Sequence, residues 1–310
     1  LEKNAEIVGK MPTLLKTVVV PYLNERPAIG NIAHAVQWSE IVAVDHAECD
    51  LSDADAIRAL VRQVQPDVIV NPAAYTAVDK AESDQDTAFA VNAVAPGVFG
   101  EEAARLNALV VHYSTDYVFD GHKAGAYTEN DTPNPQSVYG CSKLAGEQAL
   151  QAIGAKYLIF RTSWVVGAHG NNFAKTMLRL AVDRDSLSVV ADQWGAPTSA
   201  ALLADVTAQL IRQHALLNDH AFPYGLYHLV AGGETNWHDY ARYVIEAARA
   251  AGKPIKVTPD HIKAITTADY PLPAPRPANS RLDTRKLQDT FGLILPHWQL
   301  GISHILEQIL

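Results

Sequence analysis

Short apolar runs that alternate with helical patterns place the strongest constraint on the fold of this chain. Four runs are long enough to form one buried strand each: 41–44, 67–71, 109–113 and 157–161. Three stretches between them have a helical pattern: 53–65, 81–106 and 138–153. Pro96 marks a boundary or a kink in the second helix. Strands that alternate with helices at this spacing give βαβ units, so the sequence predicts an α/β fold with a doubly wound parallel sheet.

Composition narrows the class of protein. The 310 residues carry a net charge of −9, which argues against a nucleic-acid binder, because such a protein usually presents a basic face. No window holds the ~18 uninterrupted apolar residues of a membrane span, and the first residues lack a signal-peptide pattern. The two cysteines do not make a disulfide framework, and the twelve histidines show no zinc spacing. We therefore expect a cytoplasmic protein with no transition-metal site and no membrane partner.

Tyr139 and Lys143 are four residues apart in the third helical stretch, so they lie one turn from each other on the same face. Free tyrosine has a pKa of about 10 and is a poor proton source at neutral pH. An ammonium group one turn away favours the phenolate and lowers that pKa. Tyr139 then becomes a usable general acid for the reduction of a carbonyl by a hydride donor. The spacing alone also fits a solvated pair on a surface helix.

Polar residues follow the apolar run at 109–113. Ser114, Thr115 and Asp116 come directly after this predicted strand. In open α/β sheets, ligands bind at the carboxyl ends of the strands. We therefore expect the Thr115 hydroxyl to share the oxygen of the polarised carbonyl with Tyr139. Helix or turn capping is the alternative interpretation of Ser114 and Thr115.

Several motifs taken together resemble one family. The matching segments are 71–82, 112–121, 138–147, 161–164, 171–181, 192–198, 225–230 and 276–282. They are similar to the extended short-chain dehydrogenase/reductase family, and within it to the dTDP-4-dehydrorhamnose reductases, over roughly residues 41–310. The resemblance implies a Rossmann-like dinucleotide-binding domain in residues 1–165. It also implies a smaller substrate domain for a sugar nucleotide, mainly in residues 166–310, with some segments that return to the sheet.

The resemblance also implies a reaction. The hydride donor would be NADPH or NADH, and the substrate a dTDP-sugar with a ketone at carbon 4. Tyr139 would protonate the alkoxide, Lys143 would lower the tyrosine pKa and hold the nicotinamide ribose, and Thr115 would bind the reacting oxygen. The product would be dTDP-L-rhamnose, a precursor of cell-surface polysaccharide such as the O-antigen of lipopolysaccharide.

Two sets of binding residues follow from the same resemblance. The implied cofactor contacts are Asp45, Asp50, Leu51, Ala73, Ala74, Thr76, Tyr139 and Lys143. The implied substrate contacts are Thr115, Asp116, Trp164, Asn172, Lys175 and Arg281. Simpler structural roles remain open for several of them. Asp45 also fits a helix or turn cap, Asn172 a helix N-cap, Trp164 a core residue and Arg281 a surface ion pair.

The first forty residues do not follow the family pattern. A dinucleotide-binding fold begins with a strand and a turn of the form Gly-x-x-Gly-x-x-Gly, which lets the backbone approach the pyrophosphate. Residues 1–40 contain only Gly9 and Gly30, and 17–20 is a candidate strand without the turn. Three explanations stay open: another backbone geometry, a lost cofactor site in a retained fold, or a stretch that is not the natural sequence.

The sequence also leaves the exact activity and the partners open. The activity could be that of a related nucleotide-sugar epimerase or dehydratase, for which Asp116 would supply an acidic group. The chain could instead be a regulatory subunit without turnover, or a sensor that only binds the cofactor. Some family members hold Mg²⁺ between subunits, so a magnesium ion and a homodimer are open as well. Four prolines in 269–280 indicate a linker or a rigid loop over a site.

Overall fold

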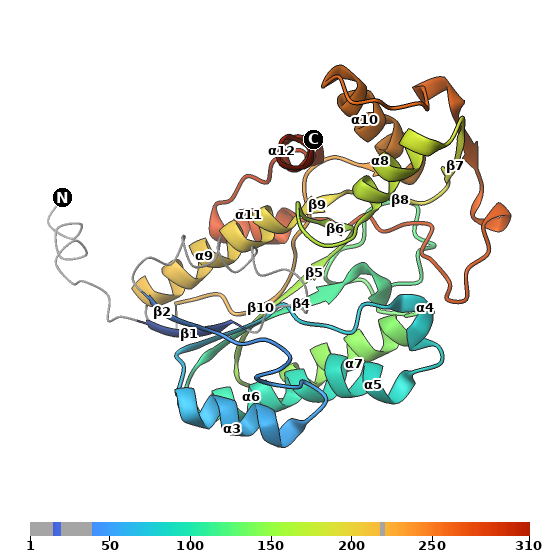
Figure 1. The fold of residues 1–310 in the computed structure, drawn as a ribbon. Coiled ribbons are helices and arrows are strands. Elements are labelled where there is room, and N and C mark those ends of the chain that lie inside the picture. Colours follow the sequence, from blue (N-terminus) through green and yellow to red (C-terminus); the bar gives the residue numbers. More distant parts are fainter. Residues whose placement is uncertain (1–14, 20–38, 218–220) are drawn as a thin grey trace, which may run out of the picture.

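The computed structural model describes residues 15–19, 39–217 and 221–310. Within them, six strands form one parallel sheet with helices on both faces, and a smaller region lies beyond it (Figure 1). This is the predicted doubly wound α/β fold. Gly9 and Gly30, on which the question of the phosphate-binding turn depends, lie outside the described residues. Among the described helices, none is both long and apolar enough to cross a membrane.

The strand order of the sheet is β10-β5-β4-β3-β1-β2. The strands are β1 (Leu15–Val19), β2 (Ser39–Ala43), β3 (Val68–Asn71), β4 (Leu109–Thr115), β5 (Lys156–Thr162) and β10 (Gly225–His228). From β1 the chain runs outward to β2 and then crosses back to β3 on the other side of β1. This reversal is the switch point outside which doubly wound sheets bind their ligands.

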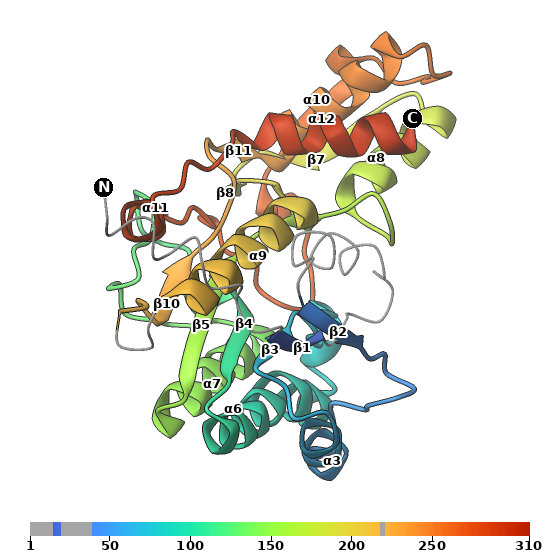
Figure 2. The ribbon, with the colours of Figure 1, turned by 90° about the vertical axis from the view of Figure 1, so that its left-hand side faces the viewer.

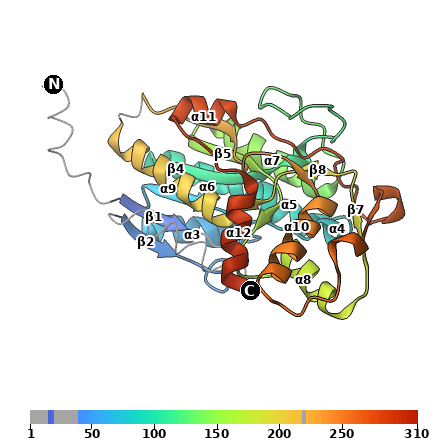
Figure 3. The ribbon, with the colours of Figure 1, turned by 90° about the horizontal axis from the view of Figure 1, so that it is seen from above.

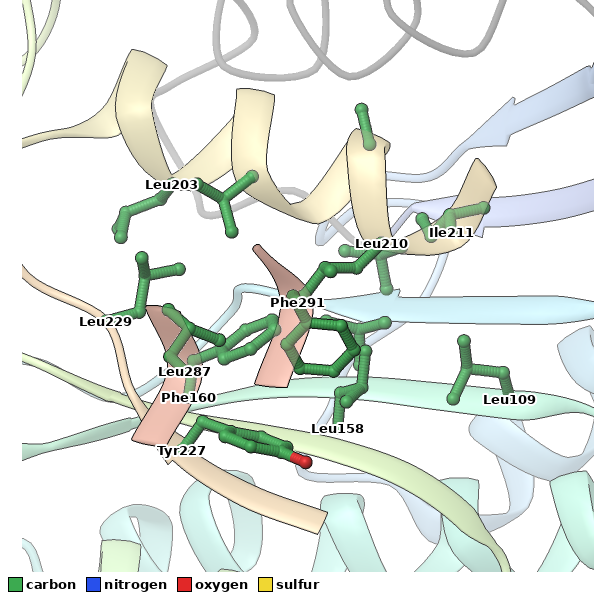
Figure 4. Packing of buried hydrophobic residues seen from close by; sticks show 14 of the residues in the cluster. Leu109, Leu158, Phe160, Leu203, Leu210, Ile211, Tyr227, Leu229, Leu287 and Phe291 are labelled. Carbon is green, nitrogen blue, oxygen red and sulfur yellow. The ribbon is translucent and has the colours of Figure 1, made fainter. Parts of the chain in front are cut away.

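One face of the sheet is covered by α3 (Ala54–Val64), α6 (Ala95–Leu106) and α7 (Val138–Ile153), and the other by α9 (Ala200–Leu216) and α11 (Arg285–Phe291) (Figures 1 and 3). The two faces follow from the alternation of side chains along each strand. Val68 and Val70 point toward α9, whereas Ile69 between them points toward α3 and α6. Figure 4 shows Leu203 and Leu210 of α9 and Phe291 of α11 packed over Leu158 and Phe160.

The predicted helix at 81–106 is interrupted in the structure. It comprises α4 (Val78–Ala81), α5 (Gln85–Phe89), a π-helical turn η1 (Ala90–Val94) and α6. Pro96 lies in the first turn of α6, where its missing N–H is tolerated, so it marks a boundary rather than a kink. A Cβ at position 146 of α7 would lie 2.1 Å from the Asn92 carbonyl oxygen. Gly146 therefore lets α7 pack directly on the π-helical turn.

The smaller region lies above the sheet, on the side away from α3 and α6 (Figure 2). It contains α8 (Phe173–Asp183), α10 (Trp237–Ala250) and α12 (Trp298–Ile309), with the strands β6 (Val165–Val166), β7 (Leu187–Val190), β8 (Trp194–Gly195), β9 (Thr198–Ser199), β11 (Thr235–Asn236) and β12 (Ile262–Ile265). Three short 3₁₀ helices complete the described elements: η2 (Asp116–Val118), η3 (Pro259–His261) and η4 (Thr267–Asp269).

The two halves of the chain are interleaved. Strand β10 pairs in parallel with β5, and α9 and α11 cover the sheet, although all three come from the later half. The expected return of later segments to the sheet is therefore present. The division into residues 1–165 and 166–310 as domains stays a prediction.

Candidate active site

The end of β4 and the start of α7 bring the predicted catalytic side chains to one edge of the sheet. Thr115 is the last residue of β4, and Tyr139 lies in the first turn of α7. The rings of Tyr139 and Tyr117 meet edge to face, with centroids 5.4 Å apart. A Cβ at Gly140 would lie 2.3 Å from the Tyr117 carbonyl oxygen, so this glycine permits the close approach of α7 to η2.

Lys143 is buried one turn further along α7, with 1% of its surface exposed. Its Nζ donates to the Tyr113 carbonyl oxygen at 2.6 Å and lies 3.4 Å from Nε2 of His112. Burial lowers the pKa of Lys143 to about 8, and the nearby Glu147 carboxylate opposes this change. An ammonium group has three donors, so one N–H remains to face a ligand or the tyrosine.

A buried ion pair anchors α7 to the sheet next to this lysine. Arg161 of β5 donates to Glu147 of α7 through Nε at 2.9 Å and through Nη2 at 2.6 Å. The Ser114 hydroxyl of β4 donates to the same carboxylate. A two-pronged contact of this kind fixes orientation as well as distance. It was not predicted from the sequence, where the available signal was a glutamate four residues after Lys143.

Asp116 follows Thr115 and is 2% exposed. The Thr115 hydroxyl donates to its Oδ1 at 3.1 Å, and its Oδ2 has no hydrogen-bond partner among the described residues. Burial raises the pKa of Asp116 to about 6, although hydrogen bonds from Ser280 and Thr115 act in the opposite direction. The carboxyl group therefore titrates close to physiological pH.

A cleft of about 590 Å³ is lined mainly by the smaller region and by the segment 270–280, and Tyr117 of η2 joins it to the residues described above. Trp164 and Trp237 stack at its wall with ring centroids 3.7 Å apart. Trp164 adopts a φ of +49°, and a Cβ at Gly195 would lie 2.8 Å from its ring. The Trp237 indole N–H donates to Gln193 at 3.1 Å, which fixes the stacked pair.

The proline-rich segment 269–280 closes one side of the cleft. Pro271, Pro275 and Pro277 are among the residues that line it. Arg276 donates to the Asp79 carboxylate at 2.7 Å, and the Ala274 N–H donates to the same group at 3.1 Å. The segment is therefore a loop over the cleft, tied to α4, rather than a linker.

The predicted substrate residues fall into two groups. Trp164 lines the cleft, whereas the other predicted substrate residues are absent from its described lining: Thr115, Asp116, Asn172, Lys175 and Arg281. Asn172 is the N-cap of α8, accepting from the Lys175 N–H at 3.0 Å. The Lys175 ammonium group donates to the Gly170 carbonyl oxygen at 3.0 Å.

Arg281 adopts the surface ion pair that its simpler structural role implied. Its Nη1 donates to Glu234 at 3.2 Å and its Nη2 to the Ala124 carbonyl oxygen at 2.6 Å. Among the described lining residues, the cationic side chains are instead Arg184 and Arg276. Neither was predicted from the sequence as a ligand, because neither lies in a spacing pattern that marks a phosphate site.

The predicted cofactor residues follow β2 and β3, beside the switch point of the sheet. Asp45 caps a turn, because its Oδ1 accepts from the N–H groups of Ala47 at 2.9 Å and Glu48 at 3.3 Å. The Asp50 carboxylate accepts from the Ser52 backbone and hydroxyl, which lower its pKa. Leu51 is buried in the core against α3.

Ala73, Ala74 and Thr76 form the loop after β3, and Asn92 of the π-helical turn holds that loop. Asn92 accepts from the Tyr75 N–H at 2.8 Å and donates to the Tyr75 carbonyl oxygen at 3.1 Å. Small side chains at Ala73 and Ala74 suit the close approach of a dinucleotide phosphate or ribose at the switch point. The residues present therefore fit a nicotinamide dinucleotide. Residues 20–38, which follow β1 and where folds of this kind place the pyrophosphate-binding turn, lie outside the described residues.

Comparison with known proteins identifies the family. Residues 30–310 match the model of the RmlD substrate binding domain. The chain belongs to this family. It is 52% identical over 260 residues to a dTDP-4-dehydrorhamnose reductase of Shigella flexneri, covering 84% of this chain and 85% of that protein. A dTDP-4-dehydrorhamnose reductase of Sinorhizobium fredii is 46% identical over 288 residues, covering 93% and 95%.

Solved structures of similar proteins agree with the fold. The dTDP-4-dehydrorhamnose reductase of Bacillus anthracis in complex with NADP superposes with a TM-score of 0.82 at 30% identity, covering 95% of this chain and 99% of that one. The UDP-glucose 4-epimerase of Thermus thermophilus in complex with NAD gives a TM-score of 0.74 at 19% identity, covering 95% and 99%. The second likeness concerns the fold alone.

Proposed function

We propose that this chain reduces the C4 ketone of dTDP-4-dehydro-L-rhamnose to dTDP-L-rhamnose with a hydride from NADPH or NADH. The observation that carries the proposal is that the start of α7 packs against the carboxyl end of β4, where Thr115 lies. Buried Lys143 donates to the Tyr113 carbonyl oxygen, and the Tyr139 ring contacts Tyr117, which lines the cleft. Membership of the RmlD family supports the substrate. The NADP in the Bacillus anthracis relative supports the cofactor class.

Each catalytic side chain has a separate task in the proposed reaction. A nicotinamide held at this site would supply the hydride for carbon 4. Tyr139 donates its proton to the oxygen of that carbon as negative charge develops there. The Thr115 hydroxyl, which donates to Asp116 in this structure, would turn to donate to the same oxygen. The Lys143 ammonium stabilises the phenolate that Tyr139 becomes. Because Lys143 is buried, its charge acts through a medium that screens it weakly.

The cleft suits a sugar nucleotide. The stacked pair of Trp164 and Trp237 gives the cleft an apolar wall for a ring, and Arg184 at the end of α8 places a positive charge on the same cleft. Arg276 is partly neutralised by Asp79. We therefore assign the diphosphate to Arg184 in preference to Lys175 or Arg281.

Titration with NADPH and NADH, followed by nicotinamide oxidation in the presence of dTDP-4-dehydrorhamnose, tests the function. Binding with turnover to dTDP-L-rhamnose would support the reductase and would indicate a working phosphate-binding turn. An epimerised or dehydrated product would favour the related enzymes instead. Binding of neither nucleotide would favour a regulatory subunit. If Asp45 lies at the adenosine ribose, its carboxylate would disfavour the 2′-phosphate of NADPH. The ratio of the NADPH and NADH affinities therefore tests the predicted role of Asp45 as well.

Magnesium, the homodimer and the cytoplasmic location stay predictions. Within the described ranges, no group of three or more His, Cys, Asp or Glu side chains could hold a metal ion. Turnover after dialysis against EDTA, with and without added Mg²⁺, tests the magnesium dependence. Sedimentation equilibrium tests the homodimer.

A further inference from the structure

His112 is a buried titratable residue that the reaction above does not use. It lies on β4 with its side chain toward α7 and none of its surface exposed. Its Nε2 is 3.4 Å from the Lys143 Nζ, and its Nδ1 is 3.3 Å from Nδ2 of Asn71 on β3. The side chains of Asn71, His112 and Lys143 thus form a continuous row across β3, β4 and α7.

The charge on Lys143 determines how protons are arranged in this row. An ammonium group only donates, so Nε2 of His112 must accept from it. The imidazole is neutral, because burial and the Lys143 charge hold the pKa of His112 well below its usual range. A neutral ring that accepts at Nε2 carries its hydrogen on Nδ1. Asn71 must then offer an acceptor to the ring N–H, and it has two: the backbone carbonyl oxygen, whose hydrogen bond raises the His112 pKa, and the side-chain amide oxygen.

The Asn71 amide is turned the other way in the structure. Its nitrogen faces Nδ1, and its buried Oδ1 has no hydrogen-bond partner among the described residues. If the amide nitrogen donates to Nδ1, the neutral ring must carry its hydrogen on Nε2. That hydrogen would point at the Lys143 nitrogen, which could accept it only as a neutral amine. A half-turn of the amide gives the arrangement that an ammonium requires, with the same number of hydrogen bonds.

We propose that His112 is a positioning residue that accepts one N–H of the Lys143 ammonium through Nε2 and is itself fixed by the Asn71 amide oxygen. With Tyr113 taking a second N–H, the third is directed toward Tyr139 and the cofactor. His112 is not a proton shuttle, because it is fully buried and the row ends at an amide that cannot pass a proton on. The catalytic consequence rests on the proposed function, whereas the hydrogen-bond arrangement does not.

Among the described residues, His112 is the side chain whose nitrogen accepts from Lys143, beside the Tyr113 carbonyl oxygen of the backbone. On α7, the Glu147 carboxylate raises the lysine pKa although it is paired with Arg161 of β5, and Tyr139 lies one turn away. From β4 the lysine meets His112 and the Tyr113 carbonyl oxygen. Loss of the imidazole acceptor should therefore lower the lysine pKa, because a hydrogen bond to the charged form favours that form.

The kinetic test compares two substitutions of His112 with the whole chain otherwise intact. His112→Leu removes the acceptor and should lower kcat about tenfold, as expected for a lost hydrogen bond to a charged group. The alkaline limb of kcat/KM should move down by about one pH unit, with little change in KM for the sugar nucleotide. His112→Gln keeps an acceptor near the Nε2 position and should restore most of kcat and the pH profile. His304→Leu, at an exposed position of α12, serves as the matched control and should change neither.

A spectroscopic test needs no substitution in the protein that is examined. In ¹⁵N-detected spectra of the histidine side chains, assigned by the loss of one ring in His112→Gln, His112 should show the Nδ1–H tautomer. It should keep that tautomer between pH 5.5 and 8, a range set by the ~6.5 of an ordinary histidine. An Nε2–H tautomer, a ring that titrates in this range, or an unchanged pH profile in His112→Leu would overturn the proposal. If the wild type shows no turnover, the proposed function fails and the tautomer alone decides the arrangement.

Discussion

The hydroxyl of Tyr139 is the group on which the proposed chemistry depends. Tyr139→Phe should lower kcat by about 10²–10⁴-fold, the usual contribution of a positioned acid. Its ring should still pack against Tyr117, so nucleotide affinity should change little. Steady-state kinetics and a fluorescence titration with NADPH separate the two effects. Tyr157→Phe is the control, because Tyr157 lies near the start of β5, away from the carboxyl ends of the strands where the site lies; it should leave kcat unchanged. Wild-type turnover in Tyr139→Phe would mean that another group delivers the proton.

Burial of Asp116 makes stability depend on pH. Its pKa is about 6 in the folded chain and 3.8 ordinarily, so the folded state binds more protons than the unfolded state between these values. The free energy of unfolding should therefore fall as pH rises through this window. Asp116→Asn removes the buried charge and should raise the free energy of unfolding at pH 7.5 by up to about 3 kcal/mol. Urea unfolding should show that this gain disappears toward pH 4.

The same substitution at Asp120 should act in the opposite direction. A hydrogen bond from the Tyr127 hydroxyl, with others from the His122 N–H and Asn134, lowers the pKa of Asp120 to about 2. Stability from this group is present above its ordinary pKa and is lost as pH falls toward 2. Asp120→Asn should therefore destabilise the chain at pH 7.5. If the free energy of unfolding at pH 7.5 changed in the same direction in both variants, burial of the Asp116 charge would not explain the effect of Asp116→Asn.

The packing of α7 on the π-helical turn depends on the lack of a side chain at position 146. Gly146→Ala would place a Cβ against the Asn92 backbone, which cannot move like the end of a side chain. We expect a loss of about 1–3 kcal/mol in unfolding free energy, as for other overpacked sites. Nucleotide affinity should fall too, because Asn92 holds the loop after β3. Denaturant unfolding measures the first effect and NADPH titration the second.

Gly97→Ala is the matched control for this prediction. Gly97 is also a helical glycine, but a Cβ there would lie 3.4 Å from the Ala149 Cβ, an ordinary contact. Alanine favours a helix over glycine by about 1 kcal/mol, so this change should be neutral or stabilising. Equal losses of unfolding free energy in Gly146→Ala and Gly97→Ala would show that the contact with Asn92 does not cause the destabilisation.

The elements themselves were largely predictable. The predicted strands at 109–113 and 157–161 lie within β4 and β5, and the predicted helix at 138–153 coincides with α7. The spacing of apolar residues indicates which side chains are buried, and in these elements the buried side chains follow the ordinary strand or helix period. The π-helical turn was not predicted, because it reflects a contact with Gly146 some fifty residues later in the chain.

At the scale of the whole molecule, the two halves of the chain depend on each other. Leu203, Leu210 and Phe291 come from the later half and cover the face of the sheet that carries Leu158 and Phe160 (Figure 4). A fragment of residues 1–165 would expose this face and lack β10. We expect it to show no cooperative thermal transition and a weak near-ultraviolet circular dichroism signal, in contrast to the full chain. A sharp transition in the fragment would show instead that residues 1–165 are an independent domain.

The sequence by itself determined the parallel α/β sheet and the predicted set Thr115, Tyr139 and Lys143, because strand alternation, helical period and strand-end position are local properties. Only the tertiary structure decided which side chains surround them. It placed Arg184 on the cleft, gave Asn172 a capping role and Arg281 an ion pair, and brought His112 to Lys143. These contacts join residues from different elements, and only packing sets the distances between elements.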